Sequence, residues 1–149
     1  MIKKIAICVL YLSVLFGQFS LAEEKFLSLK KSKVNVRYGP SFDSKIKYIY
    51  KKINLPIKQI DKKENFRRII DIKNNSGWVH ISQLKKANSI IALEDKVLFK
   101  NSSFFSEPIV KIQKGRLLVI RKCENEWCKV ETGGFKGWVD KNNLWGAIK

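Results

Sequence analysis

The chain of 149 residues is poor in the residues on which most catalytic and metal sites depend. It has one histidine and three cysteines, the residue types that supply many bases, nucleophiles and soft metal ligands. No P-loop, dinucleotide fingerprint or metal-ligand cluster appears. His80 has only Ser82 nearby, on the same expected strand, and the few carboxylates are scattered among basic residues, unlike the acid pair of a glycosidase. We therefore expect a protein that binds without catalysis, with neither a metal nor a cofactor.

Long hydrophobic runs are also scarce, and the one that exists lies at the start. Residues 5–19 are nearly all apolar; Lys3 and Lys4 precede them and Ser20-Leu21-Ala22 follows. This order is typical of a secretory signal peptide, and the run is shorter than the ~20 residues that span a bilayer. We predict a signal peptide over residues 1–22, with a membrane anchor as the alternative. Cleavage would leave a periplasmic or secreted protein without a stable membrane span.

Acidic residues are few, and they are unevenly distributed. The chain has 13 of them against 30 lysines and arginines, a formal net charge of +17. Residues 25–86 hold 17 basic and 4 acidic residues, whereas residues 87–149 hold 11 and 7. A basic excess attracts anionic partners. For an exported protein these are envelope polymers, acidic lipid headgroups or an acidic protein rather than nucleic acid. The alternative is a solvated surface of biased composition.

Two cysteines remain after removal of the signal peptide, and they flank a candidate hairpin turn. If Asn125-Glu126 forms a two-residue turn, Cys123 lies directly opposite Cys128 on the neighbouring strand, close enough for a disulfide. The spacing differs from the CxxC of redox motifs, and no further cysteine or nearby histidine completes a zinc site. We predict a structural disulfide in an oxidising compartment. The first half has Lys62 and Arg67 at the matching positions.

The remaining sequence has no convincing helical segment and contains an internal repeat. Gly77-Trp78-Val79 recurs sixty residues later as Gly137-Trp138-Val139. Short β-branched and aromatic segments alternate with turn signals, which is typical of small all-β barrels. The expected strands are 34–36, 45–50, 55–60, 66–72 and 78–81, then 96–100, 109–113, 117–121, 127–131 and 138–139. We predict an all-β fold of two tandem barrels, residues 23–86 and 87–149, joined by the short connector 85–89.

Two motifs of the first half resemble those of a known family. Val34-Asn35-Val36-Arg37-Tyr38-Gly39-Pro40-Ser41 is similar to the opening of bacterial SH3 (SH3b) domains, and Gly77-Trp78-Val79-His80 with Leu84 is similar to their ending. The second half resembles the exported tandem subfamily at residues 123–130, 133–135, 137–139 and 144–146. The resemblance implies two SH3-like barrels that attach to cell-wall peptidoglycan or short peptides. Residues 98–103 depart from the family's opening, so a mainly structural second barrel is expected if that loop forms half of the groove.

SH3-like barrels bind ligands in a groove that is usually floored by aromatic residues, between the first long loop and the hairpin loops. The ligand-binding candidates are Arg37, Tyr38, Phe42, Tyr48 and Trp78 in the first barrel and Trp127 in the second. Tyr38 is the strongest, because it lies in a loop beside a cation without an evident core partner. Three residues have a structural alternative. Arg37 would pin the loop through backbone carbonyls, and Trp78 would pack at the barrel mouth. Trp145, a further candidate in the second barrel, would seal the interface between the barrels.

Two functions are compatible with these features. The first is a wall-binding module whose tandem barrels hold peptidoglycan or short peptides and gain avidity from their linkage. The second is an envelope adaptor or scaffold that docks an acidic partner protein or an anionic surface through its basic first barrel. The salt dependence of binding distinguishes the two functions, because screening weakens binding through the basic barrel more steeply than binding through aromatic side chains. The sequence does not indicate an oligomeric state.

Overall fold

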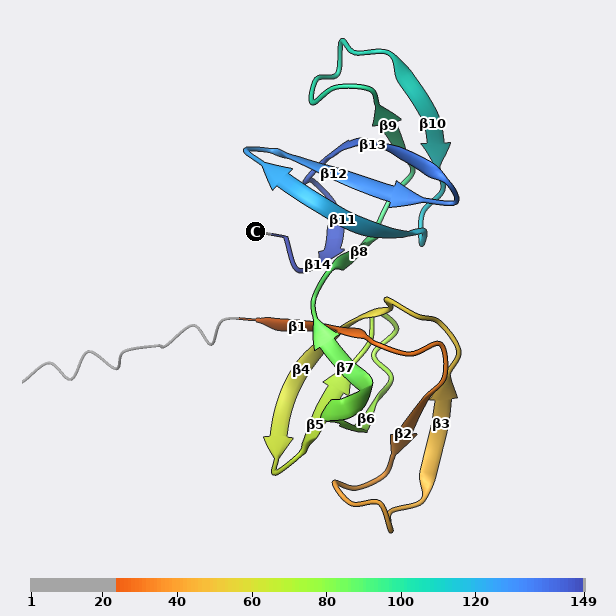
Figure 1. Ribbon diagram of the computed structural model, residues 1–149, viewed down its shortest axis with the longest axis vertical. Coiled ribbons are helices and arrows are strands. Elements are labelled where there is room, and N and C mark those ends of the chain that lie inside the picture. The colour runs from red at the N-terminus through yellow and green to blue at the C-terminus, as the bar shows by residue number, and fades with distance from the viewer. Residues whose placement is uncertain (1–23, 149) are drawn as a thin grey trace, which may run out of the picture.

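Two antiparallel sheets, each of seven strands, make up the molecule (Figure 1). The computed structural model describes residues 24–148, so the predicted signal peptide at 1–22 lies outside the described residues. The first sheet contains β1 (Lys25–Leu29), β2 (Val34–Arg37), β3 (Ile46–Tyr50), β4 (Pro56–Lys63), β5 (Phe66–Ile70), β6 (Ser76–His80) and β7 (Leu84–Lys86), with a 3-10 turn, η1 (Ile81–Gln83), before β7. We call this unit the first domain. Within residues 24–148 no helix is long and apolar enough to cross a membrane.

The second domain repeats this arrangement strand for strand. It contains β8 (Ser89–Ala92), β9 (Lys96–Phe99), β10 (Pro108–Ile112), β11 (Leu117–Glu124), β12 (Trp127–Thr132), β13 (Phe135–Asp140) and β14 (Leu144–Gly146). The strand orders are β3-β2-β6-β5-β4-β1-β7 and β10-β9-β13-β12-β11-β8-β14, so each strand has its counterpart at the same place. The predicted all-β fold of two small SH3-like domains is confirmed.

Each domain encloses its own small core, as the alternating strand pattern requires. The fully buried members of the first core are Leu29, Val34, Val36, Ile57, Ile69 and Val79, and those of the second are Ile90, Leu98, Leu118, Cys128, Val130 and Val139. Most of these side chains are β-branched, which suits a pleated surface packed on one face. Both cores are small, because units of about sixty residues bury limited surface.

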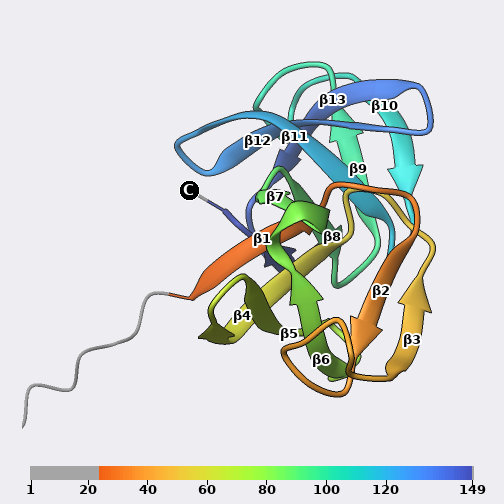
Figure 2. The same cartoon turned by 60° about the horizontal axis from the view of Figure 1, so that its bottom comes forward.

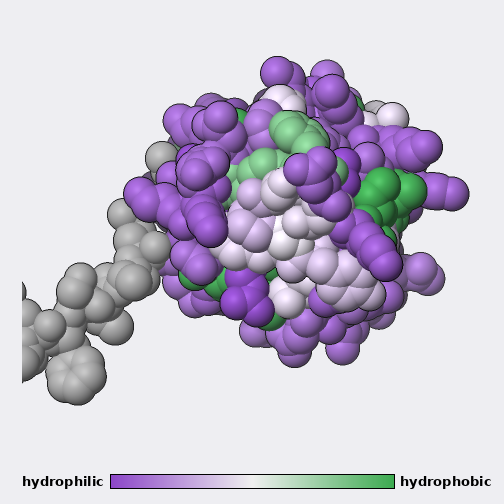
Figure 3. All heavy atoms as spheres, turned by 90° about the horizontal axis from the view of Figure 1, so that it is seen from below, coloured by the Kyte–Doolittle hydropathy of each residue, from purple (hydrophilic) through white to green (hydrophobic). Residues whose placement is uncertain are grey.

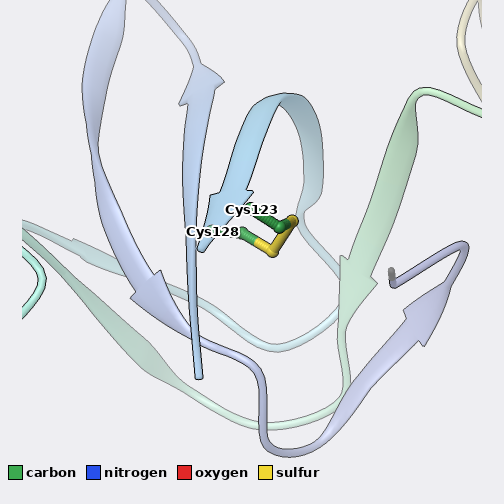
Figure 4. Close-up of a disulfide and its surroundings, with 2 residues drawn as sticks. All are labelled: Cys123 and Cys128. Carbon is green, nitrogen blue, oxygen red and sulfur yellow. A yellow bond between two sulfur atoms is a disulfide. The ribbon is translucent and has the colours of Figure 1, made fainter. Parts of the chain in front are cut away.

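The hairpin that was predicted to carry a disulfide has the expected register. Glu124 lies opposite Trp127 and Cys123 opposite Cys128, and the two cysteines are bonded (Figure 4). Asn125 has φ 48°, a conformation that asparagine tolerates in tight turns. The same hairpin of the first domain places Lys62 opposite Arg67, as the repeat predicts. Residues 61–63, which lie between the expected strands 55–60 and 66–72, instead continue β4 to Lys63, because they pair with β5 while their charged side chains stay exposed.

The two domains meet at a hydrogen-bonded junction around their neighbouring strands β1 and β8. The hydroxyl groups of Ser28 and Ser89, both fully buried, lie 2.9 Å apart, and the Ser28 oxygen accepts the backbone N–H of Asn88 at 3.1 Å. The ring of Phe26 meets that of Trp145 edge to face, with centroids 5.0 Å apart. Trp145 therefore seals the interface, the alternative that the sequence left open. In Figure 2, β1, β7 and β8 lie in the middle of the molecule.

A buried carboxylate organises the turn between β5 and β6 and fixes two tyrosines on β3. Asp71 is 7% exposed and accepts hydrogen bonds from the backbone N–H groups of Lys73 and Asn75. It also accepts one from the Tyr50 hydroxyl at 2.9 Å, and that hydroxyl lies 3.2 Å from the one of Tyr48. Burial is the main reason that the pKa of Tyr50 is raised above its usual value of 10, and the neighbouring Tyr48 and Asp71 raise it further.

This raised pKa gives an expected pH dependence. The folded Tyr50 holds its proton to higher pH than the unfolded residue, so its contribution to stability is complete below about pH 10 and is lost above it. We expect the free energy of unfolding to fall more steeply between pH 9 and 11 in the native chain than in a Tyr50→Phe variant. Urea unfolding at a series of pH values measures both slopes. Equal slopes would show that Tyr50 titrates as in the unfolded chain.

Candidate functional site

The loop between β2 and β3 folds back over the outer face of β5 and β6. Arg37 holds it in this position, because its Nη1 donates to the backbone oxygens of Phe42 at 3.0 Å and Ser44 at 2.8 Å. The guanidinium also lies 5.6 Å from the centroid of the Phe42 ring, within the range of a cation–π contact. Arg37 therefore pins the loop, which was the alternative to direct ligand contact.

A row of three side chains crosses the sheet beneath this loop. Trp78 on β6 lies opposite Arg37 on β2 and opposite Arg68 on β5. Residues directly opposed in antiparallel strands project from the same face and lie within side-chain reach. Trp78 is half-buried and Arg68 is exposed. The row therefore presents an indole between two guanidinium groups on one open surface.

One side chain of β3 reaches this row because of a β-bulge. The pairing steps from Tyr48 to Ile46 between two consecutive residues of β2, so Lys47 is the extra, unpaired residue. Bulges commonly re-aim a side chain. The Lys47 Nζ donates to the backbone oxygen of Ser76 at 2.9 Å and lies 5.7 Å from the centroid of the Tyr38 ring. Lys47 and Tyr38 thus face the row from the side of the loop.

These side chains surround a cleft of about 270 Å³ that we call the aromatic–cationic cleft. It is lined by Arg37, Tyr38, Lys47, Arg68, Ser76, Gly77 and Trp78. Tyr38 is 67% exposed at its rim. The structure therefore brings together three of the residues that the sequence selected: Arg37, Tyr38 and Trp78. Lys47 and Arg68 were missed, because only the bulge and the strand register place them here.

Phe42, another selected residue, forms a separate wall next to the cleft. Its ring lies 5.2 Å from that of Phe66 and 4.9 Å from that of His80. His80 is opposite Phe66, two residues along both strands from the Trp78 and Arg68 pair. Phe42 thus covers one end of the same sheet face. The loop position of this ring follows from the carbonyl contact that Arg37 makes with its backbone.

Two further candidates lie away from this cleft. Tyr48 faces the core side of β3, where it packs against the first core and contacts the hydroxyl of Tyr50. Trp127 belongs to the second domain and occupies the position that Phe66 has in the first, since it is opposite Asp140 as Phe66 is opposite His80. Its ring lies 4.7 Å from that of Phe104.

His80 and Ser82 form a local contact at the start of a turn. Ser82 lies in the 3-10 turn η1, where the sequence predicted a strand. The Nδ1 atom of His80 accepts the backbone N–H of Ser82 at 3.3 Å and lies 2.8 Å from its hydroxyl. This nitrogen caps the exposed end of η1, as side chains that start helical turns commonly do. No group of three or more potential metal ligands occurs within residues 24–148.

The second domain fills the position equivalent to the aromatic–cationic cleft. Its row is Phe99, Trp138 and Lys129 across β9, β13 and β12. Trp138 is only 8% exposed, and the Lys122 Nζ lies 5.3 Å from the centroid of its ring. The β10 bulge places Ile109 where the first domain has Lys47. The indole is therefore covered in the second domain and accessible in the first.

A different cleft, of about 710 Å³, lies beside the β9–β10 loop of the second domain. Glu94, Lys96, Phe104 and Asp140 are among its lining residues. The Lys96 Nζ is buried and lies 2.9 Å from an oxygen of Asp140 and 3.1 Å from one of Glu94. Asp95 also lines this cleft, so three carboxylates stand against one ammonium group and the cleft is acidic, in contrast to the basic cleft of the first domain.

A family model described as "Bacterial SH3 domain" matches residues 30–86 and 97–146. The chain belongs to the bacterial SH3 domain family. Each match covers most of one sheet of this bacterial SH3 protein, so the tandem arrangement read from the repeat is confirmed.

Two solved structures are similar to this bacterial SH3 chain over most of its length. NlpC2 from Trichomonas vaginalis matches 83% of this chain and 48% of its own, and NlpC1 from the same organism matches 84% and 46%. Both are 11% identical to this chain, with TM-scores of 0.39. The chain spans about half the length of these two proteins. No curated protein matches it.

Proposed function

We propose that this protein is a non-catalytic binding module of the cell envelope, periplasmic or secreted, that holds peptidoglycan or short peptides in the aromatic–cationic cleft. Family membership supports a cell-wall-related binding role, and the disulfide supports a location outside the cytoplasm. The observation that carries the proposal is the contrast between the domains. Trp78 is open beside Tyr38 in the first domain, whereas its counterpart Trp138 is buried under Lys122 in the second.

The test is co-sedimentation of the oxidised, exported protein with purified peptidoglycan sacculi at low and high salt. We expect binding that survives high salt and falls about tenfold in Tyr38→Ala and in Trp78→Ala, the usual effect of removing a central aromatic contact. Phe105→Ala is the matched control, because Phe105 is 101% exposed at the tip of the β9–β10 loop, outside the cleft. Wild-type binding by both cleft variants would move the site elsewhere, and absence of sedimentation would overturn the function.

The second candidate is an adaptor that docks an acidic partner protein or anionic surface through the first domain. Of the ion pairs within residues 24–148, only the one between Lys58 and Glu24 lies in the first domain. Most of its basic residues therefore remain uncompensated, and Figure 3 shows hydrophilic residues around the edge of this end of the molecule, with residues of intermediate hydropathy at its centre. Binding that disappears at high salt in the same sedimentation assay would favour this candidate.

A further inference from the structure

The aromatic–cationic cleft contains three cations and no carboxylate. Arg37 is committed to the loop carbonyls. Lys47 uses one donor on the Ser76 oxygen, and an ammonium group has three. Arg68 makes no ion pair within residues 24–148; Asp61 faces it across β4 and β5, and the Oδ1 of Asp61 accepts the backbone N–H of Lys62. Two neighbouring cations thus keep hydrogen-bond donors for a ligand.

The fold does not require the lysine of this pair, whereas the counterpart of Arg68 in the second domain is again a cation, Lys129. At the equivalent bulge the second domain has Ile109 in place of Lys47, and it forms the same strands with the same pairing. The bulge therefore accepts an apolar side chain without loss of any strand of the domain. The strand pairing thus does not depend on the charge of Lys47, and its remaining donors are available to a ligand at the mouth of the cleft.

The size and shape of the cleft restrict what that ligand can be. At about 270 Å³ it lies near the lower limit of ligand sites, so it accommodates the end of a short chain better than a length of glycan. A guanidinium forms two parallel hydrogen bonds with a planar carboxylate. The rings of Tyr38 and Trp78 supply apolar walls for the small side chain or backbone next to it.

We propose that the cleft recognises the terminal carboxylate of a short peptide, with Arg68 and Lys47 contacting the carboxylate and Tyr38 and Trp78 packing against the last residues. This assignment deepens the proposed function and rests on it for the source of the peptide. Both a cell-wall stem peptide and the C-terminus of a protein end in this group. They differ in chirality, since stem peptides commonly end in D-alanine.

Titration of the exported protein with acetyl-D-Ala-D-Ala and with its C-terminal amide tests the proposal without any variant. The indole N–H resonance of Trp78 in nitrogen-15 NMR spectra reports occupancy of the cleft. We expect the carboxylate to bind at least about tenfold more tightly than the amide, as for a hydrogen bond to a charged group. Equal affinity of the two peptides would overturn the proposal, as would an equal response to the same concentration of inorganic phosphate.

Variants identify the cations that are responsible. Arg68→Gln and Lys47→Met are expected to reduce the preference for carboxylate over amide to near unity. Lys51→Met, which removes an exposed charge just beyond β3, is expected to keep it. Loss of preference in all three would indicate a general charge effect and contradict the assignment. Acetyl-L-Ala-L-Ala is the final arm: a carboxylate preference with either chirality supports the proposal, and the tighter enantiomer identifies the source.

The outcomes for this site and for the proposed function are separable. Sacculus binding that survives high salt, together with equal affinity for the carboxylate and the amide, would leave the wall-binding function standing and remove carboxylate recognition. A strong carboxylate preference without sacculus binding would leave carboxylate recognition standing and remove the wall-binding function.

Discussion

Replacement of Trp138 by alanine should lower the free energy of unfolding by about 3–5 kcal/mol, the range for truncating a large buried aromatic side chain. Trp138 is 8% exposed, lies opposite Phe99 and Lys129 in the register, and is covered by Lys122. Its removal takes away the buried contacts of the indole with the side chains around it, among them the cation above its ring. Urea unfolding followed by circular dichroism measures the loss.

Trp78→Ala is the matched comparison, because Trp78 occupies the same position in the first domain and is only half-buried. We expect a clearly smaller loss of stability there, combined with the loss of sacculus binding described above. Trp138→Ala should retain that binding at temperatures where it stays folded. Equal destabilisation by the two substitutions would contradict the distinction between a structural and a ligand-facing tryptophan.

The second large effect is expected for Gly77→Val. A Cβ atom at Gly77 would lie 2.3 Å from Cγ1 of Val36 and 3.0 Å from the backbone oxygen of Arg37. Both neighbours belong to β2, and Val36 is fully buried in the core, so neither can move without separating two paired strands. Overpacking of this kind costs about 3 kcal/mol. It would also displace Arg37 and thereby the loop that forms one wall of the cleft.

Thermal and urea unfolding of Gly77→Val measure this cost, and Lys62→Val on the exposed part of β4 is the control. Valine at position 62 adds the same β-branched side chain where it meets solvent, so a change within about 0.5 kcal/mol is expected. Comparable stability of Gly77→Val and the native chain would show that β2 and β6 can separate at low cost.

The hairpin register and the repeat could be predicted from the sequence because both are local. A two-residue turn dictates which residues are opposed, so the turn at Asn125 predicted the Cys123–Cys128 pair without any knowledge of the sheet. The recurrence of the Gly-Trp-Val phrase predicted two similar domains in the same way. Both Gly-Trp-Val sequences lie on corresponding strands, β6 and β13, whose glycines pack closely against the neighbouring strands β2 and β9.

Four short strands escaped prediction because their partners are distant in the sequence. β1, β7, β8 and β14 have only three to five residues each. Two of them carry the buried serines Ser28 and Ser89, which are polar and therefore resemble loop residues. Their burial depends on a hydrogen bond across 61 positions of the chain, between two domains. The segment that was expected as a connector is thus mostly strand.

The candidate site was predictable in part for the same reason. Arg37, Tyr38 and Trp78 lie in motifs that the sequence shows directly. Lys47 enters the cleft only because a bulge shifts the pairing of β3, and Arg68 only because β5 aligns it with Trp78. Neither the bulge nor the alignment has a sequence signal. Tyr48 was selected with them, yet strand alternation turns it toward the core.

The junction between the domains has a consequence for how the protein can engage a large polymer. The β2–β3 and β9–β10 loops lie at opposite ends of the long axis (Figure 1), and the buried serine pair with the Phe26–Trp145 contact holds the ends apart. One short peptide can therefore reach only one loop, and linkage gives no avidity for it. Only a meshwork with attachment points a full molecular length apart could occupy both, so the protein would act there as a spacer of fixed length.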